Sequence, residues 1–579
     1  MKARTYPEYS KNYPLLLTAF MKRPVNLYPD EEAIVYRNPQ TGEYFRFTWG
    51  EWYRRTCRLA NALKALGVRP GKPNEPGDRV ATIALNNHYH LELYYAVSCL
   101  GAVLHPINMR LSLDHMVHVI THGGDKIIFF DDLFLPLVER IYDRIKGTVE
   151  RFVYLSDKPG RPETKIEALL TYHEVVEGQP FEFDWPMLHE DTYATLCYTT
   201  GTTGLPKGVM FTHRALYLMC LHLMTLGVLS NDPEREHLGE RGVTLLNVPL
   251  FHIHGWGAPY MAVFTSTKLV LPGFFTVDGF CELVQNEKVT STALVPTMLA
   301  MIIEYPDLSK YDLSSIKACS VGGGALPLGL KLKAEKVIPQ IRAGSGYGMT
   351  ETAPVTITAF IKKYHADLPE EELEKIMVKT GIPVPGIEAM VVDENMNPVP
   401  RDDATIGEIV LRGPWVMEQY YNDPERTAEV WRDGWFHTGD VAKVDKDGYI
   451  TIVDRISDMI RSGSEMVPTV LLENIAASAD FVLEAAFVGV PDDVWGQRPM
   501  ALVSLAPGAT QTEEDLIKFL MSEGVEKGRI TRWMLPEYVV ITNDIPKTSV
   551  GKFNKLEINK RLPEFLEKAR RMTRPAETV

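Results

Sequence analysis

A loop rich in glycine and threonine is the strongest chemical signal in the sequence. The segment YTTGTTGLPKGVMFTHR, Tyr198 to Arg214, follows an apolar β-type run and holds four Thr and three Gly within ten residues. Glycines let backbone N–H groups approach an anion, and threonine hydroxyls can bond phosphate oxygens or ligate Mg²⁺. Lys207 adds a positive charge, but Gly208 follows it where a Walker A loop has Ser or Thr. The loop predicts a phosphate site of another kind.

A second glycine-rich segment, GSGYGMTETAP at 344–354, carries groups suited to a nucleotide. Its glycines permit close approach of the backbone, and Tyr347 offers a flat face to a base. Thr350 supplies a hydroxyl donor, and Glu351 is a hard oxygen ligand of the kind that Mg²⁺ prefers on a triphosphate. The segment therefore predicts contacts to base, phosphate and metal.

Further along the chain, GWFHTGD at 434–440 is followed by the pair Asp454 and Arg455. The carboxylate of Asp440 suits the two ribose hydroxyls of a nucleotide, and Arg455 can add charge-assisted hydrogen bonds. The glycines of SVGGGALP at 320–327 would let backbone line an adenine or acyl pocket, although such turns are common.

These motifs, in their order and spacing, resemble the signature of the adenylate-forming superfamily, which includes acyl-CoA synthetases, luciferases and peptide-synthetase adenylation domains. The resemblance spans most of the chain. It implies that Tyr347 lies against adenine, that Asp440 and Arg455 hold the ribose, and that Thr199 and Glu351 hold Mg²⁺. The ATP- or AMP-binding residues that it implies are Thr199, Thr200, Gly201, Thr202, Thr203, Gly204, Lys207, Gly324, Ser345, Gly346, Tyr347, Gly348, Thr350, Asp440, Arg455 and Arg461.

The same resemblance assigns the catalytic lysine and the residues that bind the carboxylic acid substrate. PKTSVGKFNK at 546–555 matches the segment with the family's catalytic lysine, which implies that Lys552 acts with Thr199, Glu351 and His252. In VPLFHIHGWGAPY at 248–260, His252 would lie beside the carboxylate. Trp256 would be the gate that closes the tunnel in fatty-acyl members, with Gly324 lining the pocket. This match favours an apolar acyl chain over an amino acid.

Coenzyme A is the expected acceptor, because FVGVPDDVWGQRP at 487–499 resembles a segment of acyl-CoA synthetases. The CoA-binding residues that the family implies are Gly463, Ser464 and Glu465. Nine Lys or Arg against three Glu between Pro546 and Pro575 could meet the 3′-phosphate of CoA.

The hinge segment, DRISDMIRSGSEMVP, departs from the family pattern. Ser457, the expected hinge, replaces the usual Lys or Asp, and Ser464 replaces a second Gly. A lysine contact to the nucleotide is lost, and Arg461, one helical turn further on, is expected to compensate. A hinge needs only to tolerate a change in φ and ψ, so thioester formation is still expected.

The function predicted is AMP-forming activation of a medium- or long-chain fatty acid through an acyl-adenylate, followed by transfer to CoA. ATP, Mg²⁺ and CoA are the expected cofactor and co-substrates. A CoA ligase for a short substituted acid, such as 3-methylthiopropionate, stays open as an alternative. So do an acyl-AMP ligase, a luciferase-like enzyme and a non-catalytic adenylate-binding protein, although Lys552, Glu351 and Asp440 are all present.

The elements that must position these residues follow from periodicity. FTWGEWYRRTCRLANALKALGV at 47–68 has helical spacing and ends at a glycine, and apolar β-type runs alternate with helices to about residue 360. From about residue 380, alternating patterns with Asp-Gly turns predict an antiparallel, barrel-like section. The predicted fold is α/β. Residues 1–454 are predicted to form two helix-covered sheets and the barrel-like section, entered through a leader at 1–45, and residues 455–579 a small α+β domain. The family resemblance implies that this domain is mobile, with its hinge near 455–458.

Charge, cysteine content and hydropathy indicate which partners and compartment to expect. The 579 residues carry a net charge of −14, which argues against a nucleic-acid partner. The six cysteines form no CxxC pair, as in proteins of reducing compartments. The apolar stretch 215–231 would rise only ~25 Å as a helix, short of a bilayer, so it predicts a core helix. We expect a cytoplasmic homodimer with no transmembrane segment. Peripheral contact with a membrane stays open.

Overall fold

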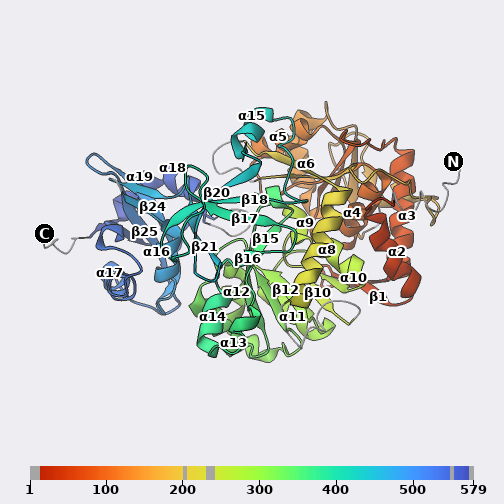
Figure 1. The fold of residues 1–579 in the computed structure, drawn as a ribbon. Helices are drawn as coiled ribbons and strands as arrows, with labels where there is room; N and C mark the ends of the chain where they lie inside the picture. Colours follow the sequence, from red (N-terminus) through yellow and green to blue (C-terminus); the bar gives the residue numbers. More distant parts are fainter. Residues whose placement is uncertain are drawn as a thin grey trace.

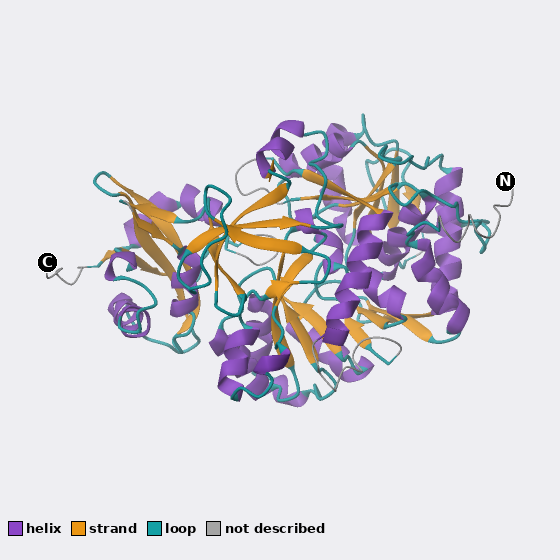
Figure 2. Ribbon diagram, in the orientation of Figure 1, coloured by secondary structure: helices purple, strands orange, loops and turns teal. Residues whose placement is uncertain are grey.

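Two large β-sheets with a layer of helices between them make up the larger body of the molecule, and a smaller body with its own sheet lies at the opposite end (Figures 1 and 2). The structure is a computed structural model, and it describes residues 13–158, 160–199, 205–229, 241–463, 465–547 and 553–572.

The first sheet has seven strands, of which six are parallel and β9 is antiparallel. Its central strands are nearly continuous apolar runs, as expected for strands covered on both faces. In spatial order it contains β7 (Leu170–Thr171), β6 (Arg151–Leu155), β5 (Asp125–Asp131), β3 (Arg79–Ile83), β4 (Val103–Pro106), β8 (Tyr193–Tyr198) and β9 (Gly208–Thr212).

The second sheet has nine strands, with a parallel centre and antiparallel strands at both edges. In spatial order it contains β16 (Ile382–Pro383), β15 (Val355–Thr358), β14 (Arg342–Gly348), β13 (Ala318–Val321), β12 (Ser291–Leu294), β10 (Val243–Leu245), β11 (Lys268–Leu271), β1 (Glu32–Arg37) and β2 (Tyr44–Thr48).

The helix layer between these sheets holds the largest apolar cluster. Every residue of α4 (His88–Leu100) is buried, which is the environment that an apolar helix without a polar face requires. Asn87 caps its first turn and Gly101 ends it in the left-handed conformation. The other helices of this region are α2 (Thr18–Leu27), α3 (Trp49–Ala65), α7 (Tyr172–Val176), α8 (His213–Leu229), α9 (Ile253–Trp256) and α10 (Ala258–Thr265).

Separate helices cover the outer face of each sheet, each with its own apolar cluster. They are α5 (Leu113–Gly123) and α6 (Leu135–Ile145) on the seven-stranded sheet, and α11 (Val277–Glu287), α12 (Pro296–Ile303), α13 (Leu328–Val337) and α14 (Glu370–Met377) on the nine-stranded sheet.

A curled antiparallel sheet joins the larger body to the smaller one (Figure 1). It is made of β17 (Glu388–Val392), β18 (Ile406–Arg412), β19 (Trp431–Arg432), β20 (Trp435–Val444) and β21 (Ile450–Arg455), with α15 (Pro424–Val430) beside it.

The smaller body, blue in Figure 1, begins directly after β21. Its sheet contains β22 (Ile460–Ser462), β23 (Glu465–Val467), β24 (Val482–Asp492), β25 (Gly496–Leu505), β26 (Tyr538–Ile541) and β27 (Arg570–Arg571). Its helices are α16 (Thr469–Ala476), α17 (Glu513–Phe519), α18 (Lys555–Lys560) and α19 (Leu562–Lys568).

The structure confirms the predicted α/β fold class, with its two helix-covered sheets, its half-barrel and its small C-terminal sheet domain. The helix expected at 47–68 is α3, which starts in a capping box of Thr48 and Glu51. Residues 213–229 form α8, and within the described ranges no helix is both long and apolar enough to cross a bilayer. The boundary at 454 and the mobility of the last domain remain predictions.

One prediction about the N-terminus is wrong. Residues 1–45 are not merely a leader, because their described part contributes α2, β1 and β2. Strand β1 pairs in parallel with β11, with Ile34 opposite Leu269. Strand β1 also pairs with the adjacent β2, but its run of four buried residues is too short a local pattern to recognise.

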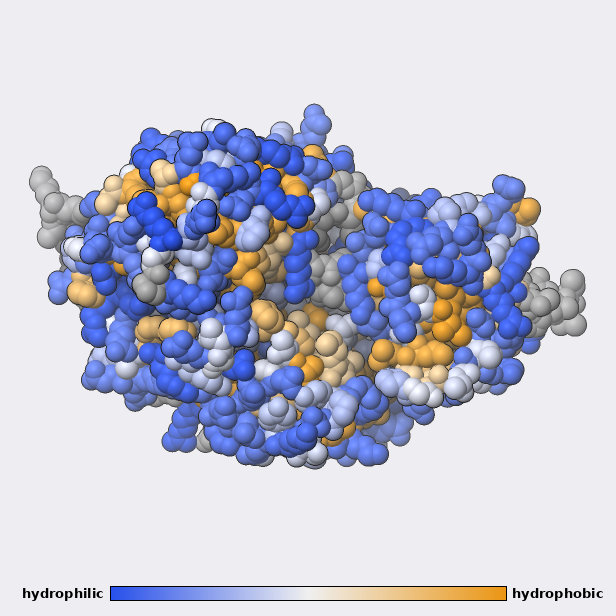
Figure 3. Space-filling view, turned by 180° about the vertical axis from the view of Figure 1, so that it is seen from behind, coloured by the Kyte–Doolittle hydropathy of each residue, from blue (hydrophilic) through white to orange (hydrophobic). Residues whose placement is uncertain are grey.

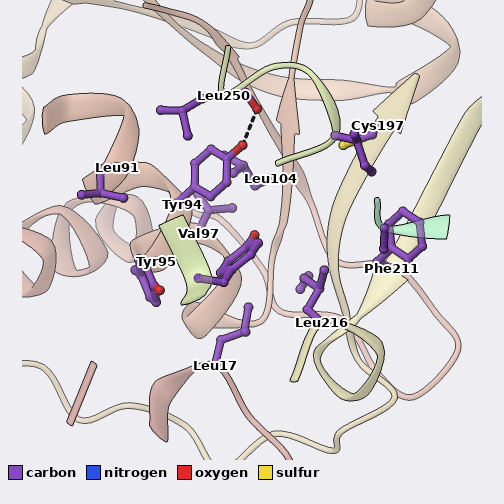
Figure 4. Packing of buried hydrophobic residues seen from close by; sticks show 14 of the residues in the cluster. Leu17, Leu91, Tyr94, Tyr95, Val97, Leu104, Cys197, Phe211, Leu216 and Leu250 are labelled. Atoms are coloured by element: carbon purple, nitrogen blue, oxygen red, sulfur yellow. Dashed lines mark hydrogen bonds between the residues drawn. The ribbon is translucent and has the colours of Figure 1, made fainter. Parts of the chain in front are cut away.

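The core also fixes the loop that leads into the site. The hydroxyl of Tyr94, on α4, donates to the carbonyl oxygen of Leu250, within the cluster that also holds Val97 and Leu104 (Figure 4). Both partners are fully buried, so the bond has no competition from water.

We predict that Tyr94→Phe lowers the stability of the folded protein by about 1–3 kcal/mol, since the buried Leu250 carbonyl loses its donor. The midpoint of thermal unfolding measures the change. Tyr364→Phe is the control, because that ring is 65% exposed. Equal shifts in the two variants would show that the Tyr94 hydroxyl is not a structural donor.

Candidate active site

A cavity of about 3300 Å³ lies where the larger body meets the curled sheet and the smaller body. From behind, apolar residues gather on the flanks of the hollow between the two bodies (Figure 3). Most of the described residues that the motifs predicted line this one cavity: Thr199, Lys207, His252, Trp256, Gly324, Ser345, Gly346, Tyr347, Gly348, Thr350, Glu351, Asp440 and Arg455. Segments as distant as 199 and 455 therefore converge on a single site.

Asp440 is the centre of the expected ribose site. One carboxylate oxygen accepts a hydrogen bond from the Tyr347 hydroxyl at 2.6 Å, and the other accepts one from Arg455 Nε at 2.9 Å. The carboxylate raises the pKa of Arg455, so that side chain stays charged. Burial, with the nearby Asp440 charge, raises the pKa of Tyr347 well above its usual range, so Tyr347 remains a donor. Carboxylate lone pairs remain for two ribose hydroxyls.

Tyr420 links the phosphate loop to Glu351. Its hydroxyl donates to Glu351 Oε1 at 2.7 Å and accepts from Lys207 Nζ at 3.2 Å. The Lys207 ammonium also lies 4.3 Å from the centre of the Tyr420 ring. At the start of the loop, the Lys207 backbone N–H donates to Thr199 Oγ1. Tyr420 and the backbone of the loop thus hold the cation, the carboxylate and the threonine together.

The donor set fits a Mg²⁺ ion that arrives with a triphosphate. Glu351 is 5% exposed and borders the cavity, and Thr199 offers a hydroxyl on the same wall. In the described part of the chain, no three His, Cys, Asp or Glu residues gather into a metal cluster. Mg²⁺ keeps several waters and takes few protein ligands when phosphates supply the rest, so one carboxylate and one hydroxyl suffice.

The segment around Trp256 is held in an unusual backbone conformation. All five residues of 253–257 have positive φ, including Ile253 at 31° and Trp256 at 55°. Left-handed backbone is costly for residues with a side chain, and such strain tends to gather at functional sites. The Trp256 ring rests on Gly322, where an added Cβ would lie 3.0 Å from the indole. The turn presents His252 and Trp256 to the cavity.

The two histidines of this segment have different surroundings. His252 lines the cavity, whereas His254 is fully buried. His254 Nε2 lies 2.8 Å from Thr195 Oγ1 and 3.4 Å from Cys197 Sγ on β8. Burial lowers the pKa of His254 to about 3, so its ring is neutral. His254 therefore anchors the turn to the first sheet.

The predicted hinge and CoA residues lie apart from the cavity wall. Arg461 is on strand β22, not one helical turn after the hinge as its spacing suggested, and its N–H donates to Gln497. Among described residues, Arg461, Gly463 and Glu465 do not line the cavity in this arrangement of the two bodies. Ser457 lies in the turn after β21, where its hydroxyl donates to Asp458 Oδ1 at 3.0 Å.

Seven predicted residues fall outside the described residues: Thr200, Gly201, Thr202, Thr203, Gly204, Ser464 and Lys552. Lys547 and Phe553, which bracket the segment containing Lys552, both line the cavity. No local motif indicates Tyr420, because its contacts with Glu351 and Lys207 join remote segments of the chain.

We predict that Gly348→Ala destabilises the protein strongly, because an added Cβ would lie 1.5 Å from the Pro354 carbonyl oxygen. Gly346→Ala is the matched control on the same strand, since its Cβ would meet only Thr358 Oγ1 at 3.9 Å. Thermal unfolding compares the two. If Gly348→Ala unfolded at the same midpoint temperature as the wild-type protein, the close approach of residue 348 to the Pro354 carbonyl would be contradicted.

Comparisons with known proteins match most of the chain to one family of enzymes. A family model described as "AMP-binding enzyme" matches residues 21–421, and one for the "AMP-binding enzyme C-terminal domain" matches residues 471–552. A long-chain-fatty-acid–CoA ligase of Thermus thermophilus is 38% identical over 97% of this chain and 98% of its own length. A 3-methylmercaptopropionyl-CoA ligase of Ruegeria lacuscaerulensis is 33% identical over 96% of this chain and 98% of its own.

The fold has a close structural counterpart. The anthranilate CoA ligase AuaEII, solved with anthranoyl-AMP, superposes with a TM-score of 0.81 at 23% identity, over 94% of this chain and 97% of that one. The chain therefore belongs to the AMP-binding, adenylate-forming enzyme family, as an AMP-forming ligase that joins a carboxylic acid to CoA.

Proposed function

We propose that this enzyme activates a medium- or long-chain fatty acid. The observation that carries the proposal is the apolar part of the cavity wall, to which α8, β10, α10 and α12 contribute. Its side chains include Leu223, Leu246, Val248, Met261, Met301 and Ile303. Burial of an acyl chain against such a wall contributes about 0.8 kcal/mol per CH₂.

In the proposed first half-reaction, a carboxylate oxygen of the acid attacks the α-phosphorus of ATP. The bond to pyrophosphate breaks, and acyl-AMP and pyrophosphate form. Asp440, Arg455 and Tyr347 orient the nucleoside, while Lys207 and Lys552 offset charge on the phosphates. Glu351 and Thr199 would hold Mg²⁺, which neutralises part of the triphosphate charge.

In the second half-reaction, the CoA thiolate attacks the acyl carbonyl carbon and AMP leaves. Gly463, Ser464 and Glu465 are the proposed contacts to CoA, and they reach the site only after the C-terminal domain turns about Ser457. The six cysteines are buried, free thiols and take no part. They are also what supports a reducing, cytoplasmic location.

A ligase for a short substituted acid is the second candidate, because the relative from Ruegeria is named for 3-methylmercaptopropionate. The test is to incubate the protein with ATP, Mg²⁺ and CoA, using straight-chain acids of increasing length and 3-methylthiopropionate, and to measure AMP and acyl-CoA. We expect both products, with kcat/KM rising with chain length. AMP without thioester would indicate an acyl-AMP ligase, and ADP in place of AMP would overturn the adenylation mechanism.

A buried ion cluster at the hinge supports the domain arrangement of the first half-reaction. Lys555 is the first residue of α18. Its ammonium group lies 3.0 Å from Glu473 Oε1 and contacts Thr469. Thr469 in turn donates through Oγ1 to Asp454 Oδ2 at 2.7 Å. Burial alone would lower the pKa of Lys555, but the charges of Glu473 and Asp454 outweigh it and raise the pKa.

Asp454 lies before the proposed hinge, whereas Thr469, Glu473 and Lys555 follow it. A rotation about Ser457 must therefore separate the carboxylate from its partners. Since Lys555 is three residues after Lys552, we infer that the cluster holds the catalytic segment against the cavity.

We predict that Lys555→Met slows acid-dependent ATP–pyrophosphate exchange about tenfold or more, because a broken buried ion pair costs about 3–5 kcal/mol. Thioester formation from synthetic acyl-AMP and CoA should be retained. Lys560→Met is the control on the same helix, since its 3.8 Å contact with Glu557 is at the surface. Lys552→Ala should likewise slow ATP–pyrophosphate exchange and retain thioester formation from acyl-AMP and CoA. An equal loss in both half-reactions would contradict the positioning role of Lys555.

A further inference from the structure

His122, near the end of α5, contacts the residues that flank the phosphate loop at 199–207. Its Nδ1 atom is 2.7 Å from the hydroxyl oxygen of Tyr198. Tyr198 is the last residue of β8 and directly precedes Thr199, where the loop starts. No residue of α5 lines the cavity. His122 therefore touches the support of the loop and not a substrate.

The same histidine also contacts the segment beside the far end of the loop. Its ring lies 5.5 Å from the ring of Tyr421, edge to face. The Tyr421 N–H donates to the carbonyl oxygen of Gly208, the first residue of β9, at 2.8 Å. Gly208 also pairs with Tyr198 across the two strands, and an added Cβ there would lie 3.1 Å from the Tyr198 ring. The strand that enters the loop and the strand that leaves it are thus both linked to His122.

The two ends of the phosphate loop are hydrogen-bonded to each other. The Thr199 N–H donates to the Lys207 carbonyl oxygen at 2.9 Å, and the Lys207 N–H donates to Thr199 Oγ1 at 3.2 Å. Lys207 Nζ reaches Tyr420, the residue before Tyr421. A displacement of Tyr198 or Tyr421 would therefore move the Thr199 hydroxyl and the Lys207 ammonium. These are the groups proposed to meet the triphosphate and its Mg²⁺, and small misplacements of such groups are costly.

The His122 ring is the acceptor in its hydrogen bond with Tyr198. Burial raises the pKa of the Tyr198 hydroxyl, so the hydroxyl keeps its proton. Among the described residues, His122 Nδ1 is the one hydrogen-bond partner of that hydroxyl. Burial, and then the neighbouring His118, lowers the pKa of His122, so the imidazole is neutral at neutral pH. A neutral ring that accepts at Nδ1 carries its proton on Nε2.

We propose that His122 is a positioning residue for ATP, which holds both ends of the phosphate loop in place through Tyr198 and Tyr421. The inference rests on the proposed function and extends it to a residue outside the cavity. The role belongs to the first half-reaction, because only that step has β- and γ-phosphates to position. Transfer from acyl-AMP to CoA does not depend on it.

The test measures the Kd of MgATP by calorimetry on the full-length enzyme in the absence of acid. His122→Leu should raise that Kd about fivefold or more, because Tyr198 loses its acceptor. His122→Asn should stay within about twofold of the wild type, since the amide oxygen can take the place of Nδ1. His118→Leu is the matched control on the same helix and should leave the Kd unchanged. The His118 ring stacks on His122 at 5.3 Å, but it is not the hydrogen-bond partner of Tyr198.

A second measurement separates positioning from a general loss of structure. His122→Leu should retain thioester formation from synthetic decanoyl-AMP and CoA. The proposal is overturned if His122→Leu binds MgATP as the wild type does, or if its thioester formation falls by the same factor as its affinity for MgATP. It is also overturned if His122→Asn binds MgATP as weakly as His122→Leu.

Should His122→Leu unfold at assay temperature, Tyr198→Phe removes the same hydrogen bond and carries the same expectation. Failure of the proposed function looks different. The wild-type enzyme would then make no acyl-CoA from straight-chain acids, and the Kd values for MgATP would still decide the role of His122.

Discussion

The bond pattern around Asp440 is the constraint on which the site depends. Asp440 lies on β20 directly opposite Arg455 on β21, so strand register alone brings carboxylate and guanidinium together. Tyr347 reaches the same carboxylate from β14 of the nine-stranded sheet. A carboxylate that is 4% exposed needs such partners, because an unpaired buried charge is strongly unfavourable. One side chain thereby joins two sheets at the edge of the cavity.

The same pair connects the nucleotide site to the start of the C-terminal body. Arg455 is the last residue of β21, and the chain turns at Ser457 before it enters β22. Asp454, beside Arg455, is bonded instead to Thr469 and the Lys555 cluster. Adjacent residues thus face the proposed nucleotide site and the C-terminal body. The proposed change in domain orientation would act on the strand that also carries the proposed ribose contact of Arg455.

The second constraint on the site is the lack of room for a side chain at two glycines. Gly348 is required because its Cβ would overlap the Pro354 carbonyl, and Gly322 because the Trp256 ring rests against it. The left-handed turn at 253–257 is held by His254, which the first sheet buries and hydrogen-bonds. Core contacts made by His254, two residues before Trp256, compensate the backbone strain at Trp256.

The sequence by itself determined the chemistry of the loops and the order of the elements. The Gly, Thr and Lys residues at 199–208 predict a phosphate site through local backbone freedom and charge, and the alternation of strands and helices is a periodic pattern. Both predictions can be made without coordinates. Two predictions from the sequence were wrong: β1, whose buried run is only four residues long, was not recognised as a strand, and Arg461 lies in strand β22 and not in a helical turn. Only the tertiary structure decided which groups Tyr420 and Lys555 contact. Each depends on which remote groups lie within hydrogen-bonding distance and on the exclusion of water, and neither is a property of a segment read alone.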